Sequence, residues 1–240
     1  MMARVSSRKP ASEADPRDRL LEAAIRLLAA GGPEALQARR LAAEVGMSTM
    51  AVYTHFGGMG QLITEIMREG FIRFGRRMEE VPRGDDPVAD LLALGLAYRD
   101  HALDNPQLYR LMFGVTSPGG RQGGKDLVVS TVANALPEGQ AAFAQLVAAV
   151  TRVIEAGGPC EEEPASAAAQ IWSAVHGYVL LEIAGFFGDD GDGVERLLLP
   201  LGTKLAVGIG AAPEHAARCA HLIAAGRPKP ERVTDGRARH

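Results

Sequence analysis

Residues 38–56 decide the fold of this chain, and they read ARRLAAEVGMSTMAVYTHF. Apolar side chains recur in the first half at the helical interval, and this pattern stops at Gly46. Ser48 is a candidate N-cap for a second short helix, which carries Val52 and Phe56 on one face. Two short helices joined by a turn with glycine form a helix-turn-helix, whose second helix can enter a DNA major groove. The stretch therefore predicts a DNA-binding element.

The outer face of the second helix has the chemistry expected of a DNA-reading surface. Its side chains are small or hydrogen-bonding and uncharged, which suits base edges, and a histidine at its end can reach a phosphate. Arginines at the start of the preceding helix can pair with guanine or with the DNA backbone. These residues are Thr49, Met50, Tyr53, Thr54 and His55 on the second helix, with Arg39 and Arg40 on the first.

Two of these side chains also have a structural interpretation. Tyr53 could simply pack the two helices together, but it lies opposite the stripe of Val52 and Phe56, which favours DNA contact. His55 could act as a cation near the carbonyl end of the helix, a role that is compatible with touching a phosphate.

Helical patterns continue on both sides of this stretch. Asp15 and Pro16 supply a cap and a first-turn proline for a helix that stops at Gly31. A run over about 61–77 follows, and we expect it to act as the lever between two domains. Further helices are expected over 88–104, 106–113, 125–135, 138–156, 165–187, 194–209 and 214–225, each bounded by Gly, Pro or Asn. No alternation of strands with helices occurs, so the predicted fold class is all-α.

Charge and punctuation divide the chain into four predicted segments. Residues 1–60 hold 8 basic and 6 acidic side chains, whereas residues 61–225 hold 13 and 21. A mildly basic beginning on an acidic body indicates two separate tasks. The segments are a disordered basic arm (1–14), a three-helix DNA-binding domain (15–60), a helical ligand-binding and dimerisation domain (61–225) and a flexible basic tail (226–240).

Composition excludes several classes of protein. The 240 residues carry a net charge of −3, which excludes a basic coat for nucleic acid. The two cysteines, Cys160 and Cys219, are too few and too far apart for a disulfide framework or a cysteine zinc site. The apolar segments are interrupted before they reach membrane-spanning length, and the N-terminus lacks a secretory signal. We therefore expect a soluble cytoplasmic protein with no membrane partner.

Metal, cofactor and catalytic signatures are not found in the sequence. Asp189, Asp190, Asp192 and Glu195 suggest calcium, but Val194 stands where a further Asx ligand is needed, which favours a solvated turn. The six histidines include no HxH or HxxxH pair, and no catalytic triad order or phosphate loop can be identified. We expect no metal, no cofactor and no enzymatic activity.

The residues from 15 to 65 resemble the N-terminal domain of the TetR family of bacterial transcriptional regulators. The motif that carries this resemblance consists of Leu41, Ala42, Gly46, Ser48, Tyr53, His55, Phe56 and Leu62. Residues from about 88 to 210 resemble the ligand domain of one subset of the family, which has a Trp, His and Gly cluster. Here the cluster is Trp172, His176 and Gly177, preceded by Tyr98 to His101 and by the segment 105–113.

The resemblance implies specific roles for the residues of the helix-turn-helix. Arg39, Thr49, Met50 and Ala51 would face base edges, and Tyr53 and His55 would hold phosphates.

The chain departs from the family pattern at two positions. Gln37 stands where a Thr or Ser usually opens the second helix, and Met59 where a phosphate-binding Lys is usual. Both departures remove contacts to the DNA backbone, so DNA binding would depend more on Arg4, Arg8 and Lys9 of the arm.

In the ligand domain, the aromatic residues are the candidates for effector contact. A lone histidine on an apolar helix is more often a hydrogen-bonded core residue than a ligand, and the aromatic side chains could equally be core. In a ligand-binding domain, however, part of the core is the wall of the pocket. The candidates are Tyr98, Tyr109, Phe113, Trp172 and His176.

Together these features predict a ligand-responsive regulator, a repressor that a small apolar or amphipathic effector releases from a palindromic operator. A homodimer would form through 165–187 and 194–209, which are rich in Ala, Leu and Val with glycines that allow close approach. Two alternatives remain open at this point. The chain could be a helical carrier or enzyme that binds no specific DNA, or a structural protein that binds DNA with little sequence preference.

Overall fold

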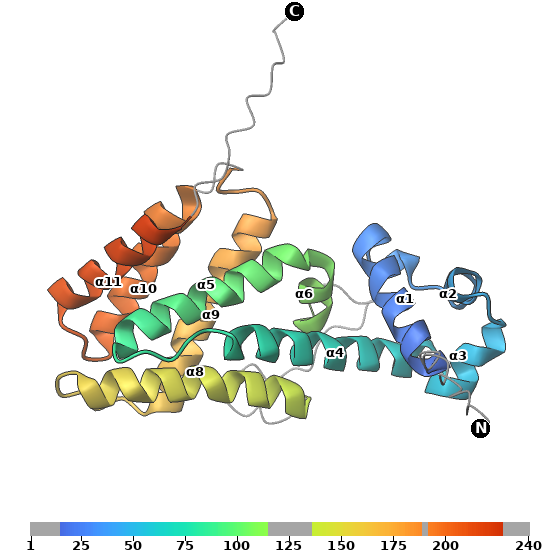
Figure 1. Cartoon of the computed structure of the whole chain (residues 1–240), viewed down its shortest axis with the longest axis horizontal. Coiled ribbons are helices and arrows are strands. Elements are labelled where there is room, and N and C mark those ends of the chain that lie inside the picture. Colours follow the sequence, from blue (N-terminus) through green and yellow to red (C-terminus); the bar gives the residue numbers. More distant parts are fainter. Residues whose placement is uncertain (1–14, 115–135, 189–191, 228–240) are drawn as a thin grey trace, which may run out of the picture. The chain divides into compact units, whose positions relative to one another are not determined.

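The computed structural model describes residues 15–114, 136–188 and 192–227 (Figure 1). The chain divides into two compact units, one up to Met67 and the other from Arg68 onward, which we call the head and the body. Every regular element within these ranges is helical, which confirms the all-α fold class. The predicted arm over 1–14, the predicted helix over 125–135 and residues 228–240 of the predicted tail lie outside the described residues.

The head contains three helices, a short 3-10 turn and the beginning of a fourth helix. These are α1 (Pro16–Gly31), η1 (Pro33–Ala35), α2 (Ala38–Val45), α3 (Thr49–Phe56) and the first part of α4 (Met59–Glu79). The Asp15 carboxylate caps α1 by accepting from the Arg17 amide at 3.0 Å. The bounds of α1, α2 and α3 agree with the sequence prediction, while η1 was not foreseen.

One apolar cluster holds the head together. Leu20, Leu28 and Val52 are completely buried, and Leu62 from the start of α4 is buried as well. The cluster is closed at its edge by Arg17, whose guanidinium lies 5.1 Å from the centre of the Phe56 ring. Burial of this apolar face is what stabilises helices as short as α2 and α3, because isolated helices of this length are marginal in water.

The body is a bundle built around α5 (Figure 1). Its elements are the rest of α4, α5 (Pro87–Asp104), α6 (Pro106–Met112), α8 (Pro137–Ala156), α9 (Pro164–Ile183), η2 (Val194–Leu198), α10 (Leu199–Gly208) and α11 (Pro213–Gly226). Helix α5 contacts α8, α9, α10 and α11, so it forms the centre of the core. None of the helices in the described part of the chain has the length and apolar character needed to cross a membrane.

Proline sets the start of six of these helices. Its ring presets the backbone angle for the first turn, where an amide hydrogen is not needed. The helices that begin with proline are α1, α5, α6, α8, α9 and α11. Acidic N-caps reinforce three of these starts: besides Asp15 at α1, Asp86 accepts from two amides of α5, and Glu163 accepts from the Ser166 amide of α9.

Two helices of the body differ from the sequence prediction. The helix expected over 165–187 ends at Ile183, because Gly185 takes a left-handed conformation (φ 83°). Its amide bonds to Glu182 and the next amide bonds to Leu181, which is the Schellman termination. The helix expected over 194–209 contains the π-helical turn η2, directly before Pro200. Proline has no amide hydrogen and its ring crowds the preceding turn, which interrupts the regular ladder there.

Candidate functional site

The turn between α2 and α3 depends on glycine. Gly46 has a φ of 68°, its amide bonds to the Ala43 carbonyl at 3.3 Å, and the Met47 amide bonds to the Ala42 carbonyl at 2.9 Å. Residues with a side chain are strained in this left-handed conformation. The Arg19 guanidinium of α1 donates to the Val45 carbonyl at 3.0 Å and so satisfies a further carbonyl at the end of α2.

Helix α3 has one buried face and one open face. Val52 and Phe56 are buried in the head, whereas Met50 is 64% exposed and Tyr53 is 53% exposed. Two large side chains three residues apart thus share the open face, which makes it a candidate contact surface.

The other residues predicted to contact DNA lie on or beside this open face. Thr49, Thr54 and Arg39 are exposed, while Ala51 and His55 are half-buried. The Thr54 hydroxyl donates to the Met50 carbonyl at 3.0 Å, which leaves its oxygen free to accept. The Tyr53 ring lies over the turn that follows α3, since a Cβ on Gly58 would be 3.8 Å from it.

Gln37 and Met59, the two departures from the family pattern, lie at the starts of α2 and α4. Gln37 occupies the N-cap position of α2 without capping it, and its amide nitrogen donates instead to the Glu34 carbonyl at 3.1 Å. Helix α4 begins at Met59, which is half-buried.

In the body, four of the predicted effector residues form a hydrogen-bonded chain. The Trp172 indole nitrogen donates to the Tyr98 hydroxyl at 3.1 Å, and the Tyr98 and Tyr109 hydroxyls lie 2.8 Å apart. The Tyr109 hydroxyl in turn lies 2.6 Å from His176 Nδ1. One polar network within the apolar core thus connects helices α5, α6 and α9.

Burial keeps the members of this network uncharged. Burial raises the pKa of Tyr98 and of Tyr109 above the ordinary value of tyrosine, and it lowers the pKa of His176 below that of a free imidazole. A neutral His176 that accepts at Nδ1 carries its proton on Nε2. The network therefore offers neutral hydrogen-bonding groups and no net charge.

Phe113 completes the cluster from the end of α6. Its ring centre lies 4.8 Å from those of Tyr109 and His176 and 6.0 Å from that of Trp172. Edge and tilted contacts at these distances are favourable for aromatic rings. The contacts position the tryptophan and the histidine relative to α6.

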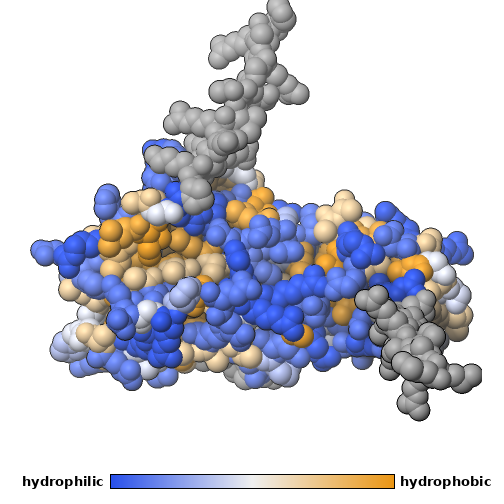
Figure 2. Space-filling model, in the orientation of Figure 1, coloured by the Kyte–Doolittle hydropathy of each residue, from blue (hydrophilic) through white to orange (hydrophobic). Residues whose placement is uncertain are grey.

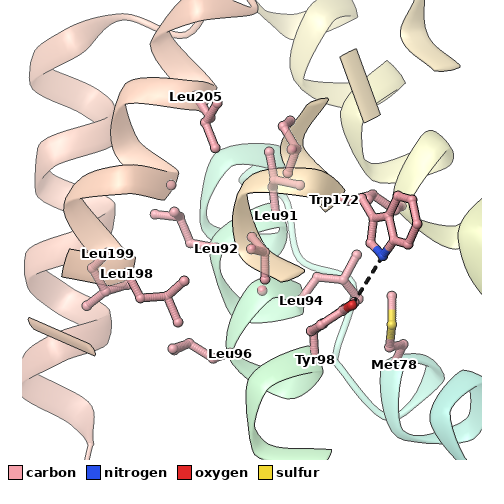
Figure 3. Close-up of a pocket in the computed structure, with 15 residues that line it drawn as sticks. Met78, Leu91, Leu92, Leu94, Leu96, Tyr98, Trp172, Leu198, Leu199 and Leu205 are labelled. Carbon is pink, nitrogen blue, oxygen red and sulfur yellow. Dashed lines mark hydrogen bonds between the residues drawn. The ribbon is translucent and has the colours of Figure 1, made fainter. Parts of the chain in front are cut away.

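A cavity of about 40 Å³ adjoins this network (Figure 3). Its wall is almost entirely aliphatic, and polar groups enter it at one end, where Tyr98 and Trp172 meet. By volume it holds about three water molecules. The remaining lining residues are Met78, Leu91, Leu92, Leu94, Gly95, Leu96, Leu146, Ile171, Val175, Leu198, Leu199, Gly202 and Leu205.

The structure therefore separates the five predicted effector residues into two groups. Tyr98 and Trp172 line the cavity, whereas Tyr109, Phe113 and His176 lie behind them and make no part of its wall. The leucines of the lining were not among the predicted residues. The run LLALGL over 91–96 was the available signal, but apolar positions of a core helix and of a pocket wall look alike in sequence.

A buried ion pair joins α5 to α9. The Arg99 guanidinium donates to both carboxylate oxygens of Glu182, at 2.7 and 2.6 Å, and to Asp100 at 2.9 Å. Two parallel bonds of this kind set the relative position of the two helices as well as stabilising them.

Apolar side chains also gather on the surface of the body. Figure 2 shows an apolar region over the part of the body where α10 and α11 lie. The large apolar side chains that the described body exposes are Leu181, Phe186, Leu197 and Leu222.

Comparison with known proteins assigns both units. A family model described as bacterial regulatory proteins, tetR family, matches residues 20–66. A second model, described as tetracyclin repressor-like, C-terminal domain, matches residues 91–199. The chain belongs to the TetR family. It is therefore a TetR-type DNA-binding transcriptional regulator, as the motif around Gly46 predicted.

Individual proteins are also similar to this chain in sequence or in fold. An uncharacterized helix-turn-helix transcriptional regulator of Mycobacterium tuberculosis is 28% identical over 176 residues, which is 72% of each chain. A solved protein of unknown function from Rhodococcus sp. RHA1 is 25% identical, with a TM-score of 0.67 over 85% of this chain and 100% of that one. RolR, solved with resorcinol, shares the fold at 16% identity and a TM-score of 0.60, over 90% of this chain and 95% of RolR.

Proposed function

We propose that this TetR-type regulator is a repressor that a small apolar or amphipathic effector releases from a palindromic operator. The observation that supports this most is the pairing of an open α3 face with an aliphatic cavity in the other unit. An effector that binds the body better in one conformation shifts the protein toward that state by its difference in affinity. Release of DNA follows if that state separates the two reading helices.

On DNA, the open face of α3 would lie in the major groove. Thr49, Met50 and Ala51 would face base edges together with Arg39, while Tyr53 and His55 would hold phosphates on either side. Thr54 shares the same surface and keeps a free acceptor. Their exposure, and the uncharged character of α3, support these roles.

The repressor would act as a homodimer. The exposed Leu181, Phe186, Leu197 and Leu222 are the apolar groups that a second copy would cover. A two-fold dimer with reading helices about 34–36 Å apart can enter successive major grooves on one side of DNA. In this arrangement residues 15–60 read DNA and residues 61–225 bind effector and pair with the second copy in the cytoplasm.

The effector would be mostly apolar, with one neutral polar group. Leucines cover most of the cavity, and the uncharged Tyr98 and Trp172 are the polar groups at its end. A charged ligand would lose its hydration there without an opposite charge to replace it. The remaining network through Tyr109 and His176, with Phe113 against it, would hold these two groups in place.

The first test is to search for the operator by footprinting the DNA beside the gene of this protein. A protected palindrome, lost in an Arg39→Ala variant, is the expected result. An enzyme or carrier without specific DNA binding would protect nothing. A structural DNA-binding protein would lose its binding to unrelated competitor DNA.

A second test fills the cavity from Gly95. Gly95 lines the cavity and a Cβ there meets no atom within 4 Å, so Gly95→Leu should add a side chain at the cavity without backbone strain, and Gly95→Ala is its smaller control. Gly95→Leu should keep operator binding but lose the response to effector, while Gly95→Ala keeps both. Fluorescence of Trp172, the single tryptophan, reports binding directly. A full response in Gly95→Leu would place the effector elsewhere.

A further inference from the structure

Three potential metal ligands meet at the junction of α5 and α11. Asp86 precedes α5, and His215 and Cys219 lie four residues apart on α11, so they share one face of that helix. Asp86 lies 129 residues before His215 and 133 residues before Cys219, so only the fold brings it to the other two. They take no part in the DNA-reading face or in the wall of the cavity.

The donor atoms are separated by distances typical of metal ligands. His215 Nε2 lies 3.0 Å from Asp86 Oδ1, Cys219 Sγ lies 3.2 Å from Asp86 Oδ2, and Cys219 Sγ lies 3.6 Å from His215 Nε2. Ligands placed about 2.0–2.3 Å from a tetrahedral zinc ion are about 3.3–3.8 Å apart, so the two shorter separations would have to widen by a few tenths of an ångström. A metal ion can therefore be accommodated by side-chain rotation, without moving either helix.

We propose that Asp86, His215 and Cys219 form a binding site for a divalent transition metal of the zinc type. Thiolate, imidazole and carboxylate are the three side-chain ligands that zinc uses, and the presence of sulfur disfavours magnesium and calcium. Three protein ligands leave the fourth tetrahedral position for water.

The site is open on one side and closed on the other. The side chains of His215 and Asp86 are 40% and 36% exposed, whereas Cys219 is buried. Solvent therefore reaches the two outer ligands, which provides a path for the ion and room for a bound water. The sulfur beneath them is held in position by the packing of α11.

The two outer oxygens of Asp86 have separate tasks. Oδ1 accepts from the Val88 and Ala89 amides, which caps α5, and lies 3.0 Å from His215 Nε2, whereas Oδ2 faces Cys219. Within the cluster, Oδ2 contacts the Cys219 sulfur alone, at 3.2 Å. Oδ2 can thus bind a metal while Oδ1 keeps its cap.

Metal binding would remove one proton from the cluster. Burial and the neighbouring Asp86 raise the pKa of the Cys219 thiol to about 11, so sulfur is protonated at neutral pH without metal. The ion forms a bond to sulfur and the thiol proton leaves to solvent, with no change of oxidation state.

Occupation of the site would join α11 to the start of α5. Helix α5 begins to line the cavity at Leu91, little more than one turn after Asp86. The expected consequence is a body that resists unfolding more strongly when the metal is bound, by the ordinary mass action of a ligand on the folded state.

The test uses the full-length, tag-free protein after treatment with a chelator, with Co²⁺ and Zn²⁺ as the probes. Cobalt should produce a thiolate charge-transfer absorption at one ion per chain, and zinc should displace it and raise the melting temperature. Cys219→Ser should remove the absorption. His215→Gln and Asp86→Asn should weaken zinc binding by at least about tenfold, since even outer-shell changes cost 10–100-fold.

Controls separate this site from other sources of binding. Cys160→Ser removes the second cysteine of the chain and should leave cobalt absorption unchanged. Asn is as good an N-cap as Asp, so Asp86→Asn should retain the fold, which a melting curve without metal verifies. The proposal is overturned if cobalt gives no thiolate absorption, or if the three variants bind zinc as tightly as the parent protein.

Discussion

The head and the body use their functional side chains in opposite ways. On α3 the residues that would read DNA point outward, and only Val52 and Phe56 hold that helix in the core. In the body a group that would meet an effector is itself a core residue: Tyr98 is buried and hydrogen-bonded to Tyr109 behind it. A surface can therefore be altered in the head at little cost in stability, while changes in the body affect stability and function together.

The largest expected difference between the body and the head is in the stability that is lost when an ion pair is broken. Arg99→Ala would leave Glu182 buried without its partner and should lower the free energy of unfolding by about 3–5 kcal/mol. The exposed pair Arg26–Glu44, which joins α1 to α2 in the head, is the matched control, and Arg26→Ala should cost at most about 1 kcal/mol. Denaturant unfolding measures both. If both variants lost the same free energy of unfolding, the buried pair of the body would contribute no more to stability than the exposed pair of the head.

Substitutions on the open face should act on DNA binding and leave stability unchanged. Arg39→Ala should weaken operator binding by about 1–3 kcal/mol per half-site and relax the preference at one base pair. Tyr53→Phe should weaken binding to all sequences alike, because a phosphate contact carries no base information. Binding titrations on operator variants separate the two effects, and a uniform loss from both substitutions would exclude base reading by Arg39.

A buried histidine should make stability depend on pH. Burial, with Arg77 and Arg73 nearby and partly opposed by Asp104, lowers the pKa of His101 to about 4. Below its unfolded pKa of about 6.5, the unfolded chain binds a proton that the folded chain refuses, so stability falls as pH falls.

Between pH 8 and pH 5 this histidine alone should cost about 2 kcal/mol, at about 1.4 kcal/mol per pKa unit. His101→Leu should remove that part of the pH dependence, since it replaces a buried ring whose Nε2 has no hydrogen-bond partner. The measurement is denaturant unfolding of both proteins at the two pH values. If the free energy of unfolding changed equally with pH in the parent and in His101→Leu, the pH dependence would arise from other groups.

The smallest expected effect is a gain in stability from a side-chain cap at the start of α2. Gln37 leaves this helix without a side-chain cap, and Gln37→Thr should stabilise the head by about 1 kcal/mol. Gln37→Ala, which cannot cap either, is the control. Thermal melting that fails to distinguish the two variants would contradict the capping argument.

The sequence predicted the head better than the body for a physical reason. Gly46, Ser48 and the apolar stripe of α3 act locally, and the first-turn prolines mark helix starts without reference to the rest of the chain. The end of α9 was misplaced, although Gly185 was a local signal for it.

Sites made by distant segments could not be predicted in this way. His215 and Cys219 show a helical spacing that is a weak indication by itself, and nothing in the sequence places Asp86 beside them. The same holds for the cavity, because a leucine that faces a void and a leucine that faces another leucine have the same pattern. Only packing between α5, α9 and α10 distinguishes them.

The small size of the cavity has a consequence for the speed of the response. If a molecule larger than a few waters enters by displacing the leucines of α5 and α10, its entry would be limited by the opening of the body. At high effector concentration the observed association rate should then reach a plateau that equals the opening rate, instead of rising in proportion to concentration. The packing of a few aliphatic side chains would thus set how quickly the regulator responds to its signal.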